Sequence, residues 1–143
     1  MRVVIDARYV RAQPGGIGRV VEALAAHLPP LDRDVHFHFW AHPERPEPSR
    51  GVNVSCQVVD APADGLRTLI APRLLGEIAE GDVFHLPFSI LGPRPPGLPV
   101  VTIHDLMWLE QPRWVDRRPL IGRVREPFYR LGMLAAMRYA RRI

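Results

Sequence analysis

Apolar positions along the chain form short continuous runs, which predict buried strands, and stripes at three- and four-residue spacing, which predict helices. The runs predict five strands, at residues 2–6, 35–41, 52–59, 82–86 and 100–103. The stripes predict helices over residues 17–27, 66–79 and 119 to about 142. Alternation of this kind is typical of a parallel sheet with helices on both faces. Because crossovers are right-handed, we expect the first, fourth and fifth strands to be neighbours near the centre of the sheet.

Prolines mark the places where these predicted helices should end or bend. Pro29 and Pro30 should stop the first helix, because a proline has no N–H for the helical hydrogen bond. Pro72 should break or kink the second helix, and Pro127 should kink or restart the third.

The stretch at residues 14–19, which reads PGGIGR, lies between the first predicted strand and the first predicted helix. A strand, a glycine loop and a helix in this order aim backbone N–H groups at an anion. Gly15 and Gly16 would let such a ligand approach with no Cβ in its way. The loop therefore predicts a site for a phosphate-bearing ligand, and a tight turn that only packs the helix on the sheet is the alternative. The dinucleotide fingerprint fits poorly, because Val21 occupies the position of its third glycine.

Two chemically capable residues, His104 and Asp105, follow the fifth predicted strand. Ligands of parallel sheets bind beyond the carboxyl ends of the strands, so these residues should meet the glycine loop at one crevice. His85 ends the fourth predicted strand at the same edge and is a secondary candidate. The alternative for His104 is a hydrogen bond to local backbone groups, and the alternative for Asp105 is a cap on the next turn.

Three stretches together carry a resemblance to a known family. They are MRVVIDAR at 1–8 with the glycine loop, DVFHLP at 82–87 and VVTIHDL at 100–106. In this order and spacing they resemble the amino-terminal lobe of retaining glycosyltransferases of the GT4 family, which has the GT-B fold. The resemblance implies a single Rossmann-like α/β domain over residues 1–143. It also implies transfer of a sugar, with retention, from a nucleotide-sugar donor to an acceptor, without a metal or other cofactor.

The resemblance also implies roles for individual residues. His104 matches the histidine that contacts the transferred sugar, which makes it the candidate catalytic residue. Gly15 and Gly16 match a loop near the donor diphosphate and the acceptor. Arg19 matches a position that is often basic or polar. Asp105 is expected to support the site rather than to contact the substrate.

The family's nucleotide-binding residues lie in a second lobe, for which 143 residues leave no room. We therefore expect this chain to be an incomplete lobe, a fragment or half-enzyme that is inactive alone. A non-catalytic Rossmann-like module for binding or interaction is the alternative. A lobe without its partner would expose apolar surface, so we also expect self-association.

Composition bears on location and on partners. No apolar run approaches about 18 residues, no signal peptide precedes the first strand, and Cys56 is the only cysteine, so a cytoplasmic location is expected. The net charge is +4, but eight arginines fall within residues 117–142, against the acidic residues Asp116 and Glu126. A solvated helix face accounts for them, and contact with the anionic inner face of a membrane is the alternative. No basic loop with interleaved aromatic residues supports binding of nucleic acid.

Two patterns could suggest a metal, and we interpret both as structural. Asp32-Arg33-Asp34 resembles the Asp-x-Asp of metal-dependent glycosyltransferases, but it precedes a strand and so belongs at the opposite edge of the sheet. His36 and His38 alternate on one face of a strand, with no third ligand nearby in sequence. We therefore expect no metal site.

Overall fold

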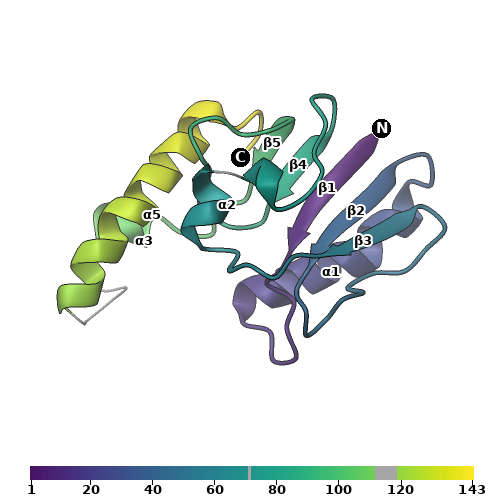
Figure 1. Ribbon diagram of the computed structural model, residues 1–143, viewed down its shortest axis with the longest axis horizontal. Helices are drawn as coiled ribbons and strands as arrows, with labels where there is room; N and C mark the ends of the chain where they lie inside the picture. Colours follow the sequence, from purple (N-terminus) through teal and green to yellow (C-terminus); the bar gives the residue numbers. More distant parts are fainter. Residues whose placement is uncertain (71, 112–118) are drawn as a thin grey trace.

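The computed structural model describes residues 1–70, 72–111 and 119–143 (Figure 1). Within these residues five strands form one parallel sheet in the order β3-β2-β1-β4-β5. The strands are β1 (Arg2–Ala7), β2 (His36–Ala41), β3 (Val54–Val58), β4 (Val83–Leu86) and β5 (Leu98–Val101). The helices are α1 (Gly16–Leu31), α2 (Leu66–Ile70), the short 3₁₀ helix η1 (Pro72–Leu74), α3 (Met107–Glu110) and α5 (Pro119–Tyr139).

The sheet confirms the α/β class, the parallel pairing and the adjacency of β1, β4 and β5. One detail of the prediction is wrong, because β5 lies at the edge of the five strands and only β1 is central. Beyond β5, the last residues of the chain start a parallel pairing. The N–H of Val101 donates to the carbonyl of Arg142 at 3.1 Å, and the N–H of Arg141 donates to the carbonyl of Pro99 at 2.7 Å.

Successive residues of the strands point to opposite faces, and a helix covers each face. On one face Ile5 of β1 belongs to the same buried cluster as Val21 of α1. On the other face Val4 of β1 and Phe84 of β4 belong to a cluster with Ala136 of α5. Burying each of the larger apolar side chains in these clusters contributes about 1.5–3 kcal/mol, so both helices are held on the sheet by apolar burial.

The predicted end of the first helix is wrong, because α1 continues through Pro29 and Pro30 to Leu31. A proline at position 29 leaves the carbonyl of Ala25 without its helical donor. The hydroxyl of Ser49 donates to that carbonyl at 2.5 Å. The side-chain amide of Asn53 donates to the carbonyl of Pro29 at 3.1 Å. A neighbouring loop therefore satisfies the carbonyl that Pro29 leaves without its helical donor, and it also satisfies a carbonyl of the last turn of α1.

The other helices also differ from their predicted bounds. The helix predicted over 66–79 is only α2, and η1 begins at Pro72, as expected of a break at this proline. The last helix, α5, continues through Pro127 and ends at Tyr139 rather than near Arg142, because the residues after it pair with β5. The strand predicted at 100–103 begins and ends two positions earlier, as β5.

Candidate functional site

The glycine loop leads into the first turn of α1, whose N-cap residue is Gly15. Among the described residues no side chain caps this end of the helix, and no acidic residue lies in its first turn. The N–H of Arg19 donates to the carbonyl of Gly15 at 3.0 Å. The N–H groups of Gly16, Ile17 and Gly18 precede this bond, so they belong to the set that a helix cannot satisfy internally. The start of α1 thus keeps its partial positive charge available to an anion.

The three glycines of the loop differ in what surrounds them. A Cβ added at Gly15 or Gly16 would meet no atom within 4 Å, whereas one at Gly18 would lie 2.4 Å from the carbonyl oxygen of Tyr9. None of the three has a positive φ. Packing therefore explains Gly18, a requirement that sequence reasoning missed. The chain's own packing does not explain Gly15 and Gly16, which leave open space beside the free N–H groups.

His104 is exposed and lies beyond the end of β5, in the segment that leads to α3. Its Nε2 lies 3.0 Å from the carbonyl oxygen of Pro87. A carbonyl only accepts, so Nε2 carries the proton of this bond, and in the neutral ring Nδ1 is left as an acceptor. The alternative considered for His104 was a bond to local backbone, and the observed bond is to backbone 17 residues earlier in the sequence. This bond orients the ring and leaves one nitrogen for a ligand.

Asp105 and Arg19, the two charged candidates, are both exposed. The Oδ1 atom of Asp105 accepts a hydrogen bond from the N–H of Met107 at 2.9 Å, so this carboxylate shapes the turn into α3. That contact is the cap we considered for Asp105, and it suits the expected supporting role. Arg19 sits in the first turn of α1, next to the free N–H groups, and adds positive charge there.

His85 lies in β4, paired in register with Ile5, and so faces the side of the sheet that α1 covers. Its Nε2 is 3.0 Å from the hydroxyl oxygen of Thr102. Burial lowers the pKa of this imidazole, although the charge of Asp6 opposes the shift, so the ring is neutral at physiological pH. The contact with Thr102 joins β4 to the segment after β5, which gives His85 a structural role, while the site role expected of it stays a prediction.

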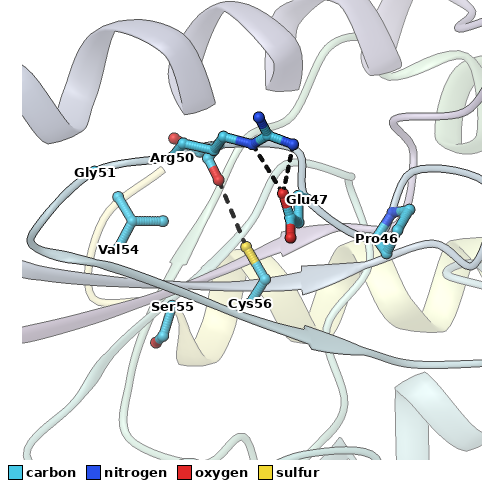
Figure 2. A pocket seen from close by; sticks show the side chains of 8 residues that line it. Pro46, Glu47, Arg50, Gly51, Val54, Ser55 and Cys56 are labelled. Atoms are coloured by element: carbon cyan, nitrogen blue, oxygen red, sulfur yellow. Dashed lines mark hydrogen bonds and ion pairs between the residues drawn. The ribbon is translucent and has the colours of Figure 1, made fainter.

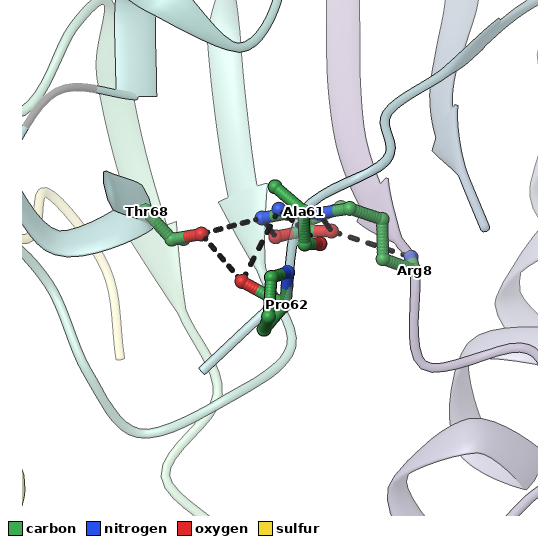
Figure 3. Close-up of polar contacts among 5 residues, drawn as sticks. Arg8, Ala61, Pro62 and Thr68 are labelled. Atoms are coloured by element: carbon green, nitrogen blue, oxygen red, sulfur yellow. Dashed lines mark hydrogen bonds and ion pairs between the residues drawn. The ribbon is translucent and has the colours of Figure 1, made fainter. Parts of the chain in front are cut away.

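A buried ion pair at the end of β1 was missed by sequence reasoning. Arg8 is fully buried, and its Nε and Nη2 atoms donate to the two carboxylate oxygens of Asp6 at 2.8 and 2.6 Å (Figure 3). It also donates to the carbonyl of Ala61 and the hydroxyl of Thr68, each at 3.0 Å. Burial alone would lower the pKa of Arg8, but the hydrogen bond and charge of Asp6 raise it above its ordinary value. The guanidinium thus stays charged and fastens the end of β1 to α2.

Four aromatic side chains form a wall at this edge of the sheet. Ring centroids are 5.3 Å apart for Tyr9 and Phe88, 5.9 Å for Phe88 and Tyr129, and 4.4 Å for the stacked pair Trp108 and Tyr129. These residues follow β1, β4 and β5 or come from α5, so they converge from distant parts of the sequence. The hydroxyl of Tyr9 is buried and has no hydrogen-bond partner within the described residues, and burial raises its pKa, so it stays protonated.

Other polar features lie away from this edge. His36 and His38 both contact the hydroxyl oxygen of Ser55, at 2.8 and 2.7 Å, and the described part of the chain holds no group of three metal-binding side chains. A cavity of about 460 Å³ lies beside the first residues of β3, at the opposite edge of the sheet (Figure 2). Burial raises the pKa of Cys56, which lines this cavity and donates to the carbonyl of Ser49, so the thiol stays protonated.

Comparisons with known proteins match no family model, no curated protein and no solved structure. The class of the protein therefore follows from its own fold and site. It is an α/β domain whose parallel sheet is Rossmann-like, with the uncapped start of α1 and the exposed His104 following the carboxyl ends of β1 and β5.

Proposed function

We propose that this chain is the acceptor-side lobe of a retaining glycosyltransferase of the GT-B type. The observation that carries the proposal is the start of α1, where Gly15 and Gly16 leave free N–H groups, open space and no capping carboxylate. Helix starts of this kind bind phosphate. The diphosphate of a nucleotide-sugar is a ligand of this chemistry, and the sequence resemblance described above points to the same class of donor.

In this proposal each candidate residue at the carboxyl edge of the sheet has its own role. The N–H groups at the start of α1 face the diphosphate, and Arg19 adds a positive charge in the same turn. The Nδ1 atom of His104 accepts a hydrogen bond from a hydroxyl of the transferred sugar, while Pro87 holds the opposite side of the ring. Asp105 keeps the segment around His104 in its turn.

The nucleotide itself would be held mainly by a second lobe, as the resemblance implies. The chain alone would then bind a nucleotide-sugar weakly and would not transfer sugar. A calorimetric titration of the chain with UDP-glucose or GDP-mannose tests this division, since tight binding to the isolated chain would contradict it.

The role of His104 is tested by turnover in the enzyme that contains both lobes. His104→Ala should lower kcat by about tenfold or more, which corresponds to about 1.4 kcal/mol of lost transition-state stabilisation. His27→Ala is the matched control, because His27 is also exposed but lies within α1, away from its start. Full activity of His104→Ala would overturn the assignment of this histidine.

A further inference from the structure

The outward face of α5 is unusual for a surface helix. The helix runs along the side of the molecule farthest from β3 (Figure 1), and its inner face buries Tyr129, Met133 and Ala136. Exposed positions recur on the other side at three- and four-residue steps, and they are Pro127, Arg130, Leu131, Leu134, Met137 and Arg138. The outer face of such a helix is normally polar. Here the exposed positions are apolar residues and arginines, with no carboxylate among them.

The apolar residues of this face are exposed to a large extent. Relative exposure is 65% for Leu131, 47% for Leu134 and 42% for Met137. Single exposed leucines are ordinary on protein surfaces. A continuous row of exposed apolar residues along one helix indicates a surface that binds other apolar material.

An apolar groove of about 360 Å³ adjoins this face. Leu131 and Leu134 of α5 form one wall, and Leu91 and Pro93 form the other. The N–H of Leu91 donates to the carbonyl of Gly132 at 3.0 Å, which holds this second wall against the helix. The groove is lined by hydrocarbon and opens beside Arg138, so it suits a hydrocarbon chain attached to an anion.

Basic residues gather on the outward face of α5 and directly after the helix. Arg130 and Arg138 lie on the outward face of α5, and Arg141 and Arg142 follow the end of the helix. All four are exposed, and no carboxylate within the described residues forms an ion pair with them. Two arginines on the outward face of an amphipathic helix, with two more directly after it, suit an anionic lipid surface, to which each basic residue contributes about 1 kcal/mol of attraction.

We propose that α5 docks the protein onto an anionic phospholipid bilayer, lying in the plane of the interface. The leucines and Met137 enter the boundary of the acyl chains, the groove takes the end of one chain, and the arginines bind lipid phosphates. None of the described helices is long and apolar enough to cross a bilayer. The contact is therefore with one surface of the membrane, the mode of an interfacial amphipathic helix. This proposal is independent of sugar transfer, because it uses a different element and a different chemistry.

Co-sedimentation of the chain with lipid vesicles tests the proposal. The chain should sediment with vesicles of phosphatidylcholine mixed with phosphatidylglycerol, and much less with vesicles of phosphatidylcholine alone. The double variant Arg130→Gln/Arg138→Gln should weaken binding to the mixed vesicles about 25-fold, at about fivefold per arginine. The double variant Leu131→Gln/Leu134→Gln should weaken it by about tenfold or more.

A matched control uses an exposed leucine and an exposed arginine elsewhere. Leu31→Gln/Arg33→Gln changes the same residue types at the far end of α1, where Leu31 is exposed, and should leave vesicle binding unchanged. All the substituted side chains are exposed, so circular dichroism should show the same fold in every variant. Raising the ionic strength from about 0.1 M to about 1 M should also weaken binding, because it shortens the Debye length from about 10 Å to about 3 Å.

Several outcomes would overturn the proposal. Equal binding to both kinds of vesicle would remove the role of the arginines, and absence of binding to mixed vesicles would remove the docking surface. Loss of binding in the control variant would show that the effect is not specific to α5. Light scattering provides a further test, since a dimer that dissociates in the Leu131→Gln/Leu134→Gln variant would show that a second copy of the chain covers this face.

Discussion

Removing the guanidinium of Arg8 should be among the most damaging single substitutions in this protein. The side chain is fully buried, makes two hydrogen bonds to Asp6 and binds Ala61 and Thr68 as well. In Arg8→Met the carboxylate of Asp6 stays buried without its partner. Breaking a buried pair from one side costs about 3–5 kcal/mol. The whole domain has about 5–15 kcal/mol of stability, so the variant should lose a large part of it.

Urea denaturation followed by tryptophan fluorescence measures this loss, because Trp40 is fully buried in the folded protein and becomes exposed to water on unfolding. The double variant Asp6→Asn/Arg8→Met removes the unpaired charge, so it should be more stable than the sum of the two single losses predicts. Arg50→Met is the matched control. Its ion pair with Glu47 is short, at 2.7 Å, but the arginine side chain is 85% exposed, so its loss should cost only a small fraction of the Arg8 effect.

Two results would refute this reasoning about the buried pair. One is a loss of stability in Arg8→Met that is no larger than the loss in Arg50→Met. The other is strict additivity of the single variants in the double variant, which would mean that the two side chains act independently.

Two further predictions concern the glycine loop and the buried histidine. Gly18→Ala should lower the free energy of unfolding by about 1–3 kcal/mol, because the added Cβ would lie 2.4 Å from the carbonyl oxygen of Tyr9. The control Gly16→Ala adds a Cβ that meets no atom within 4 Å, so this variant should unfold at the same urea concentration as the wild type. Burial lowers the pKa of His85 below its ordinary value of 6.5. As the pH falls below 6.5, the unfolded chain therefore takes up a proton before the folded protein does. The free energy of unfolding should decline below pH 6.5 and stay level above it. His85→Gln should remove this part of the pH dependence in urea titrations at acidic and neutral pH, and an unchanged profile would contradict it.

The elements most accessible from sequence were the strands. The continuous apolar run VVI in β1 was assigned correctly to a strand, because a strand buried on both faces needs apolar residues at successive positions. The end of α1 was not accessible, because it depends on hydrogen bonds from Ser49 and Asn53, 24 residues from the carbonyls that they satisfy. Local sequence shows the proline, but it does not show a distant donor that compensates for it.

The candidate site, like the fold, could be predicted from the sequence only in part. Strand order alone places the glycine loop and His104 at one edge of the sheet, so the sequence could predict their positions. The contact between Arg8 and Thr68 joins residues that are 60 positions apart, so no local sequence pattern predicts it. The aromatic wall likewise needs the packed loops before it can be recognised.

The central claim, that the start of α1 and His104 bind a nucleotide-sugar, is tested most directly by a ¹⁵N nuclear magnetic resonance titration of the chain with UDP-glucose and GDP-mannose. We expect shift changes at the amides of Gly16, Ile17 and Gly18 and at His104, which should vanish in Gly16→Val. The same changes should persist in Gly81→Val, whose exposed glycine also has open space around it. Absence of shifts at the start of α1 with either ligand, or their persistence in Gly16→Val, would contradict the account.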